Sequence, residues 1–148
     1  MKRLGVLAVL CGVLAGSRPA VAQGPPAWAQ ERTRQWYAAF NAGDAVAIGR
    51  LYAPDAVLLI EGMTHAGHDA VQAFHAANFE TARFDCTWTI VGLTTVDKLA
   101  AVWGEDACVD SPKSAGPAQS WKGHWLMVYQ RQPDGSWLIV RDSGEDAR

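Results

Sequence analysis

The sequence predicts a single α+β domain, with three helices in its first half and an antiparallel sheet in its second half. Apolar residues recur at helical spacing between positions 27 and 77, whereas β-branched and aromatic residues dominate from Phe84 onward. A third observation is the turn Gln132-Pro133-Asp134-Gly135, whose proline, aspartate and glycine stand where a type I turn favours them. Helices followed by a run of strands are typical of the α+β class.

The chain begins with the features of a secretory signal peptide. Met1-Lys2-Arg3 is basic, residues 4–14 are apolar, and Ala20-Val21-Ala22 is a small-x-small cleavage site. The apolar run is too short to span a bilayer of about 30 Å. We therefore expect a signal peptide over residues 1–22, a linker over residues 23–26 and one secreted or periplasmic domain over residues 27–148, with no membrane contact after cleavage.

The mature chain is acidic. Cleavage removes three of the 13 basic residues and none of the 15 acidic residues, which leaves a net charge near −5. An acidic surface repels phosphate backbones, so nucleic acid is not expected as a partner. The remaining 126 residues suit one hydrophobic core, and seven tryptophans supply apolar area for it.

Three helices are expected before the sheet. The first covers residues 27–42, where large apolar side chains recur at helical spacing and Gly43 ends the run. Asp44 is placed to cap a second helix, which must end before Pro54. A third helix is expected over residues 67–77, because it again shows one apolar stripe.

Five strands are expected after the second helix. The early strand covers residues 55–62 and is followed by a polar loop at residues 63–66. The four later strands form two hairpins, over residues 84–110 and 121–142, which a flexible loop at residues 111–120 connects.

The last hairpin has a predicted register. A three-residue loop at Pro133-Asp134-Gly135 pairs Tyr129 with Ile139, Val128 with Val140 and Leu126 with Asp142. One face then carries Trp125, Met127, Tyr129, Trp137 and Ile139, and the other carries His124, Leu126, Val128, Leu138, Val140 and Asp142. Both faces are apolar, so we expect both to be covered.

Two cysteines remain after cleavage, Cys86 and Cys108. If the middle hairpin turns near Val96-Asp97-Lys98, residues whose numbers sum to 194 lie opposite each other, and these cysteines do so. We expect them to form a disulfide in an oxidising compartment, with two buried free thiols as the alternative. Closing a loop of about 20 residues would stabilise the fold by roughly 3 kcal/mol.

Four sequence phrases occur in a recognisable order. They are Trp36-Tyr37-Ala38-Ala39-Phe40-Asn41-Ala42-Gly43-Asp44, Leu51-Tyr52-Ala53-Pro54-Asp55-Ala56, Gly67-His68-Asp69-Ala70-Val71, and Asp134-Gly135-Ser136-Trp137 with Arg141-Asp142. Over about residues 27–145 the chain resembles the NTF2-like superfamily, specifically its SnoaL-like and DUF4440 branches. The resemblance implies a cone, in which a strongly bent antiparallel sheet wraps around three N-terminal helices and leaves a pocket open at one end. It also implies homodimers that form through the outer face of the sheet.

The chain departs from the steroid isomerases of this superfamily at the positions that carry their chemistry. Ile60 stands where their general base lies on the first strand. Trp36 matches their first-helix tyrosine, and Val128 roughly matches their protonated aspartate. Isoleucine and valine neither transfer a proton nor stabilise an enolate, so steroid-isomerase chemistry is not expected.

The resemblance identifies the Asp142 face of the last hairpin with the pocket. Asp142 and His124 are then diagonal neighbours, with Asp142 as a base that moves a proton and His124 orienting it. SnoaL-like cyclases are similar in placing an acidic base on a late strand. The expected pocket walls are Trp36, Tyr52, Leu58, Ile60, Trp88, Leu126, Val128 and Val140. The simpler alternative is that Asp142 anchors a strand end and that His124 bonds a backbone group.

The opposite face of the hairpin, from Trp125 to Ile139, is too apolar to be exposed, so we expect it to form the homodimer interface. Three histidines, His65, His68 and His75, lack the spacing of a metal motif, and neither a metal nor another cofactor is expected.

Two functions are consistent with these features. The first is an exported acid–base enzyme, of isomerase, cyclase or dehydratase type, that acts on a small apolar or aromatic molecule. The second is a non-catalytic ligand-binding or dimerisation module. A buried titratable group in the pocket would distinguish the enzyme from the binding module.

Overall fold

The computed structural model describes residues 24–147, with the side chains of residues 24–145. The predicted signal peptide lies outside these residues. Three helices and a six-stranded curled sheet confirm the predicted α+β cone. The elements follow one another in the order α1 (Ala27–Ala42), α2 (Ala45–Gly49), β1 (Tyr52–Ile60), β2 (Met63–Ala66), α3 (His68–Thr81), β3 (Ala82–Val96), β4 (Leu99–Pro112), β5 (Gln119–Arg131) and β6 (Trp137–Ala147).

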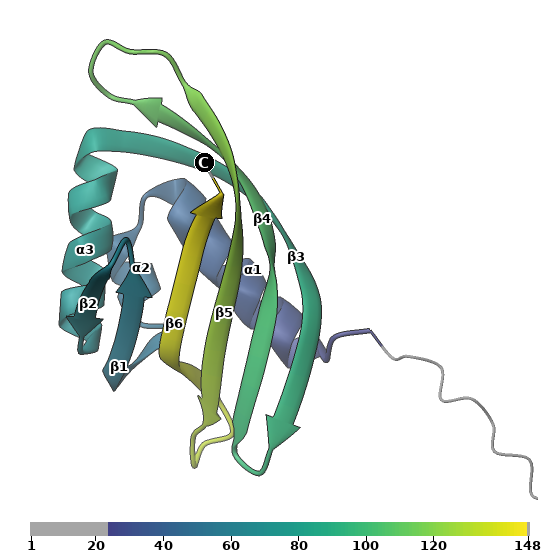
Figure 1. Ribbon diagram of the computed structural model, residues 1–148. Coiled ribbons are helices and arrows are strands. Elements are labelled where there is room, and N and C mark those ends of the chain that lie inside the picture. Colours follow the sequence, from purple (N-terminus) through teal and green to yellow (C-terminus); the bar gives the residue numbers. More distant parts are fainter. Residues whose placement is uncertain (1–23, 148) are drawn as a thin grey trace, which may run out of the picture.

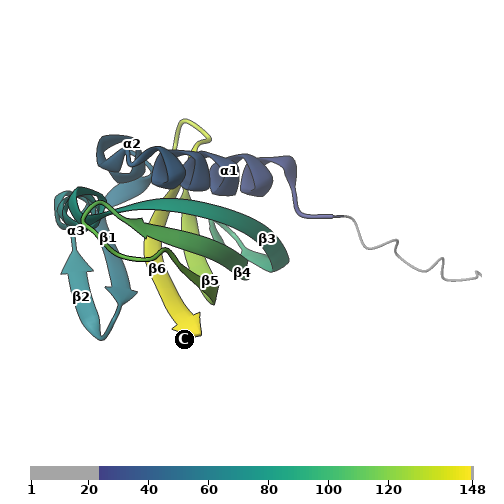
Figure 2. The same cartoon turned by 90° about the horizontal axis from the view of Figure 1, so that it is seen from above.

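The sheet has the strand order β2-β1-β6-β5-β4-β3, in which β1 and β6 are parallel and all other neighbours antiparallel. Helix α1 lies along one face of this bent sheet, while α3 lies at its β1–β2 end (Figures 1 and 2). Helix α1 therefore covers one face of the sheet, and α3 covers its β1–β2 end.

The first half of the chain differs from the prediction at two places. The second helix ends at Gly49, and Tyr52 already belongs to β1 because Ile139 donates its backbone N–H to Leu51 at 2.9 Å. The predicted polar loop at residues 63–66 is instead strand β2, paired antiparallel with β1. Glu61 and Gly62 both have positive φ angles, of 53° and 74°, which suit a tight hairpin turn.

The ends of the helices follow the predicted signals more closely. Helix α1 has the predicted bounds, and Gly43 ends it in the left-handed conformation at φ 67°. Asp44 caps α2 as expected, since its carboxylate accepts the backbone N–H of Ala47 at 2.9 Å. Helix α3 continues to Thr81 because its buried stripe extends to Phe79.

The face predicted to form a dimer interface is the hydrophobic core. Trp125, Met127, Tyr129 and Ile139 are buried, and Trp28 of α1 stacks on Trp137 at a centroid distance of 4.2 Å. A helix of the same chain therefore covers this face, and the prediction of an interface there is wrong. The homodimer remains a prediction, and these buried residues are excluded from its interface.

A bulge in β6 changes the predicted register of the last hairpin. Tyr129 pairs with Ile139 as expected, but beyond that point Val128 pairs with Arg141 and Met127 with Asp142. Val140 is the extra residue, and one extra residue turns every later side chain to the other face. Asp142 consequently lies on the inner face with Met127.

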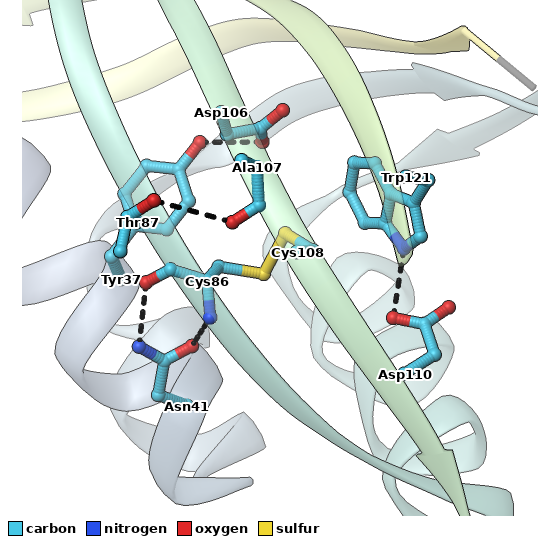
Figure 3. The surroundings of a disulfide bond; sticks show 9 residues. All are labelled: Tyr37, Asn41, Cys86, Thr87, Asp106, Ala107, Cys108, Asp110 and Trp121. Atoms are coloured by element: carbon cyan, nitrogen blue, oxygen red, sulfur yellow. Dashed lines mark hydrogen bonds between the residues drawn. A yellow bond between two sulfur atoms is a disulfide. The ribbon is translucent and has the colours of Figure 1, made fainter. Parts of the chain in front are cut away.

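The predicted disulfide is present between β3 and β4 (Figure 3). Cys86 pairs with Cys108, and their Cα atoms are 4.1 Å apart. Asn41 of α1 makes two hydrogen bonds to the backbone of Cys86. Its side-chain NH₂ group donates to the Cys86 carbonyl at 2.9 Å, and its side-chain oxygen accepts the Cys86 N–H at 2.8 Å. The disulfide links β3 to β4, and the two hydrogen bonds of Asn41 hold α1 against β3.

Candidate functional site

A cavity of about 280 Å³ lies between the helices and the inner face of the sheet. It has nearly twice the volume of an apolar cavity of roughly 150 Å³ that holds benzene, so a bicyclic molecule fits its size. Six large aromatic side chains contribute to its wall: Trp36, Phe40, Phe74, Phe84, Trp121 and Trp125.

The predicted wall residues divide into two groups. Trp36, Leu58 and Ile60 line the cavity, and Tyr52 is buried directly behind the wall, where it bonds Trp36. The remaining four predicted wall residues do not line the cavity: Trp88, Leu126, Val128 and Val140.

The physical reasons for these four differences are local. Trp88 stacks on Tyr37 at a centroid distance of 5.9 Å and supports the wall from behind. Leu126 is 42% exposed, because it lies on the outer face of the sheet beside Val128. Val140 occupies the bulge. The face that was expected to line the pocket is the outer face of the sheet.

Asp142 lies at the inner end of a chain of hydrogen bonds. Its carboxylate accepts a hydrogen bond from the hydroxyl of Tyr52, and that hydroxyl accepts the indole N–H of Trp36 at 3.0 Å. The three residues come from β6, β1 and α1, and the parallel pairing of Leu58 with Asp142 brings the two strands together. Asp142 is 5% exposed and borders the cavity.

Burial sets the ionisation of this pair. It raises the pKa of Asp142 to about 6, although the hydrogen bonds from Tyr52 and from the Ser143 backbone act in the opposite direction. Burial and the neighbouring carboxylate raise the pKa of Tyr52 well above its ordinary value. At neutral pH the site therefore holds a carboxylate that accepts a hydrogen bond from a neutral tyrosine. A carboxylate with a pKa near neutral pH suits a general base.

His124 does not join Asp142. Its side chain is 73% exposed on the outer side of β5, and its Nε2 lies 3.9 Å from a carboxylate oxygen of Glu105. His124 is nevertheless among the residues that line the cavity. The expected contact between His124 and Asp142 is wrong because the bulge at Val140 turns Asp142 inward, whereas His124 stays on the outer face.

His75 lines the cavity, although no role was predicted for it from the sequence. It lies on α3, is 3% exposed, and packs its ring against Trp36, Phe40 and Phe74 at centroid distances of 5.2 to 5.9 Å. Burial, with a smaller effect from His65, lowers its pKa to about 4. Among the described residues, neither ring nitrogen has a hydrogen-bond partner.

The helical periodicity of α3 indicates that His75 is buried. His75 stands four residues after Val71 and four before Phe79, and all three are buried along one stripe of α3. A histidine in the middle of such a stripe faces the core. Across residues 24–145, no group of three or more His, Cys, Asp or Glu side chains could hold a metal ion.

Two further hydrogen bonds join residues of the cavity lining and are visible in Figure 3. The Tyr37 hydroxyl donates to Asp106 at 2.7 Å, and the indole N–H of Trp121 donates to Asp110 at 2.8 Å. Trp125 lies nearby, T-shaped to Tyr37 at a centroid distance of 6.4 Å. Its indole N–H is buried and has no hydrogen-bond partner among the described residues.

No helix in the described part of the chain has the length and apolar character needed to cross a membrane. A search of curated proteins finds no significant relative. Solved structures do show the fold. A ketosteroid isomerase-like protein from Erwinia carotovora atroseptica is 23% identical, with a TM-score of 0.77 over 82% of this chain and 95% of that chain.

A hexachlorocyclohexane dehydrochlorinase from Novosphingobium barchaimii is 16% identical, with a TM-score of 0.73 over 82% of this chain and 86% of that chain. At these identities the likeness establishes the fold alone. The sequence model of the SnoaL-like domain, however, matches residues 33–140. The chain therefore belongs to the SnoaL-like domain family of the NTF2-like superfamily.

Proposed function

We propose that this protein is an acid–base enzyme that removes a proton from carbon on a small, mainly apolar substrate, with Asp142 as the general base. One observation carries the proposal: a carboxylate is buried at the wall of an aromatic cavity and held by the hydroxyl of Tyr52. A binding pocket for apolar molecules has no need of such a group. Burying it without a catalytic use only destabilises the fold.

The reaction step follows from the chemistry of a carboxylate. Asp142 takes a proton from a carbon next to a carbonyl group, and the electron pair of the broken C–H bond moves onto the carbonyl oxygen. The protonated Asp142 then returns the proton to the same or another carbon, which completes an exchange or an isomerisation. Tyr52 and Trp36 position the carboxylate through their hydrogen bonds.

Two of the similar structures are compatible with this reaction class. One is a hexachlorocyclohexane dehydrochlorinase and the other a ketosteroid isomerase-like protein, and elimination and isomerisation are both reactions that a general base can promote. The support extends to the type of proton transfer and not to the substrate, because the identities are low.

We also infer that the enzyme acts after export. The disulfide between Cys86 and Cys108 supports an oxidising compartment, as does the basic and apolar start of the sequence.

The test uses β-tetralone, an uncharged bicyclic ketone with acidic hydrogens beside its carbonyl group. The mature domain in D₂O should accelerate deuterium uptake by the ketone, as followed by NMR. Asp142→Asn should reduce that rate by about a hundredfold or more while the ketone still binds. Asp55→Asn, which changes an exposed carboxylate, is the matched control.

Unchanged exchange in the Asp142→Asn protein would contradict the assignment of the base. If the wild-type protein binds β-tetralone without exchange above the solvent background, proton abstraction fails. The second candidate, a non-catalytic ligand-binding module, then takes its place.

A further inference from the structure

The charged side chains that line the cavity are acidic. The lining includes five carboxylates and, among the described residues, no lysine or arginine: Glu61, Asp106, Asp110, Asp142 and Glu145 are the acids. Its two histidines do not offset this charge, because burial lowers the pKa of His75 to about 4 and His124 is largely exposed to solvent. A lining of this kind repels anions and favours a positively charged ligand.

Two of these acids, Asp106 and Asp110, lie beside Trp121 (Figure 3). All three side chains are half-buried. The indole N–H of Trp121 donates to Asp110 at 2.8 Å. The hydroxyl of Tyr37 donates to Asp106 at 2.7 Å. An indole and a phenol carry no positive charge, so these bonds orient the two carboxylates without neutralising them.

Gly123 allows Asp106 and Trp121 to lie side by side. A Cβ atom added to Gly123 would lie 2.7 Å from Oδ1 of Asp106 and 3.1 Å from the ring of Trp121. Oδ1 of Asp106 is buried there, so Asp106 acts on a ligand through its charge, whereas the half-buried Asp110 and Trp121 are open to direct contact. An electron-rich ring next to two carboxylates suits an organic ammonium group, because the ring itself attracts cations.

The sheet register sets the distance from these acids to the base. Asp106 pairs with Gly123 of β5. Asp142 pairs with Met127, four positions further along the same strand. At about 3.3 Å per residue, the backbones of the two acids lie about 13 Å apart along the strand direction. A bicyclic ring with an amine on a short side chain can therefore place a carbon at Asp142 and its nitrogen beside Trp121.

We infer that the substrate is an organic cation, whose protonated amine lies against Trp121 and Asp110 while its apolar ring fills the aromatic part of the cavity and presents a C–H bond to Asp142. The inference rests on the proposed function for the reaction, and it adds the charge and the chemical class of the substrate. It concerns binding, so it is tested without any turnover.

The experiment compares three β-tetralones by calorimetry at pH 7, each with a different group at the end of the ring far from the ketone. A dimethylaminomethyl group is charged at this pH, an isobutyl group has the same shape without the charge, and a carboxymethyl group is negative. The ammonium compound should bind about tenfold more tightly than the isobutyl compound, and the carboxylate should bind weakest. Equal or tighter binding of the isobutyl compound or the carboxylate would overturn the inference, as would failure of the ammonium compound to bind at millimolar concentration.

Two variants locate the ammonium group. Asp110→Asn keeps the shape and an acceptor for the indole of Trp121 but removes the charge. It should reduce the preference for the ammonium compound over the isobutyl compound by about threefold or more. Trp121→Leu should also reduce this preference, because it removes the aromatic ring. Binding of the isobutyl compound shows that each variant is folded, and a folded variant that keeps the full preference would overturn the inference.

The matched control is Asp55→Asn, which removes an exposed carboxylate that does not line the cavity. This variant should keep the wild-type preference for the ammonium compound. An equal loss of preference in Asp55→Asn and Asp110→Asn would show a general attraction of cations to an acidic protein, and the assignment of the ammonium group to the cavity would fail.

A third measurement needs no variant. In the wild-type protein, NMR should show NOEs between the N-methyl protons of the bound ammonium compound and the ring protons of Trp121. NOEs from these protons to Leu58, which pairs with Asp142, would show the opposite orientation and overturn the inference. The Asp142→Asn protein should still prefer the ammonium compound, so a wrong substrate class and a wrong base give different results.

Discussion

Asp142 and His75 are two buried titratable groups on one cavity, and the fold treats them differently. Both are at most 5% exposed. Burial favours the uncharged form of each, so it raises the pKa of Asp142 to about 6 and lowers that of His75 to about 4. Asp142, however, receives a hydrogen bond from Tyr52, whereas His75 packs against aromatic rings and has no hydrogen-bond partner among the described residues. The comparison separates a group positioned by hydrogen bonds from one held by packing against aromatic rings.

The two groups also have opposite effects on stability as the pH changes. The unfolded chain binds the extra proton of His75 between about pH 6.5 and 4, so stability falls as the pH falls through this window. The folded chain holds the extra proton of Asp142 between about pH 3.8 and 6, so stability falls as the pH rises through it. In the wild-type protein these contributions largely offset each other.

The largest expected effect comes from replacing His75, which removes one of the two offsetting contributions to the pH dependence of stability. The buried histidine destabilises the wild-type protein at low pH, and His75→Phe removes that contribution. Between pH 7 and pH 4 the variant should gain about 3 kcal/mol in unfolding free energy relative to wild type, since a tenfold change in acidity corresponds to about 1.4 kcal/mol. Urea unfolding across this range measures it.

The control for this prediction is His124→Gln, which replaces an imidazole that is 73% exposed. That variant should follow the wild-type pH dependence. If His75→Phe also follows it, His75 does not remain neutral in the folded protein, and the contrast between the two groups disappears.

A slightly smaller effect of the opposite sign is expected at Asp142. Asp142→Asn removes a carboxylate that is harder to ionise when buried, so the variant should gain about 2 kcal/mol relative to wild type between pH 4 and pH 7. The same urea series measures it, with Asp55→Asn as the exposed control. A constant difference between Asp142→Asn and wild type across this range would mean that burial does not raise the pKa of Asp142.

A third change addresses the hydrogen bond that distinguishes the two groups. Tyr52→Phe removes a donor that holds the pKa of Asp142 down, so this pKa should rise further above 6. The acid limb of the pH–rate profile for deuterium exchange should then move up by about one pH unit, because a hydrogen bond to a charged group contributes about 1.5 kcal/mol or more.

Tyr37→Phe is the matched control for Tyr52→Phe, because the Tyr37 hydroxyl bonds Asp106 instead of Asp142. Its pH–rate profile should keep the wild-type midpoint. If both tyrosine variants move the midpoint equally, the effect comes from a general change in the cavity and not from the bond to Asp142.

The positions of the helices and strands were predicted better than the face of the sheet on which each side chain lies. The reason is that the ends of helices depend on neighbouring residues, whereas the faces depend on bulges. Helix ends depend on residues such as Gly43 and Asp44, whose conformations and hydrogen bonds involve near neighbours. The bulge at Val140 has no such signal, since valine is an ordinary strand residue, yet it moves Asp142 from one face to the other. Asp142 borders the cavity as expected, but only because two errors offset each other. The face assigned to the pocket is the outer face of the sheet, and the bulge that turns Asp142 to the inner face was not predicted.

A bulge also changes the register of the middle hairpin, but there the predicted pairing of the two cysteines is kept. Val96 pairs with Leu99 around a two-residue turn, which alone would put Cys86 and Cys108 out of register by one residue. A bulge between Ile90 and Gly92 restores the pairing. The predicted turn was slightly displaced, and the bulge was not predicted. The pairing of the two cysteines was nevertheless predicted correctly, because their symmetric placement in the sequence agrees with the final register. Similarly, β2 was missed because its turn needs a positive φ at Glu61.

The smallest expected effect concerns the outer link of the hydrogen-bond chain. Trp36 donates to the Tyr52 hydroxyl at 3.0 Å, and this bond makes that hydroxyl a better donor to Asp142. Trp36→Phe should therefore raise the midpoint of the pH–rate profile by a few tenths of a pH unit, less than Tyr52→Phe. The ring of Trp36 also packs against His75, with centroids 5.7 Å apart, and phenylalanine keeps an aromatic contact there. In the double variant Trp36→Phe with Tyr52→Phe, the midpoint should match that of Tyr52→Phe alone, because Trp36 acts on Asp142 only through the tyrosine. Additive shifts would show that Trp36 influences the carboxylate by a route that does not pass through Tyr52.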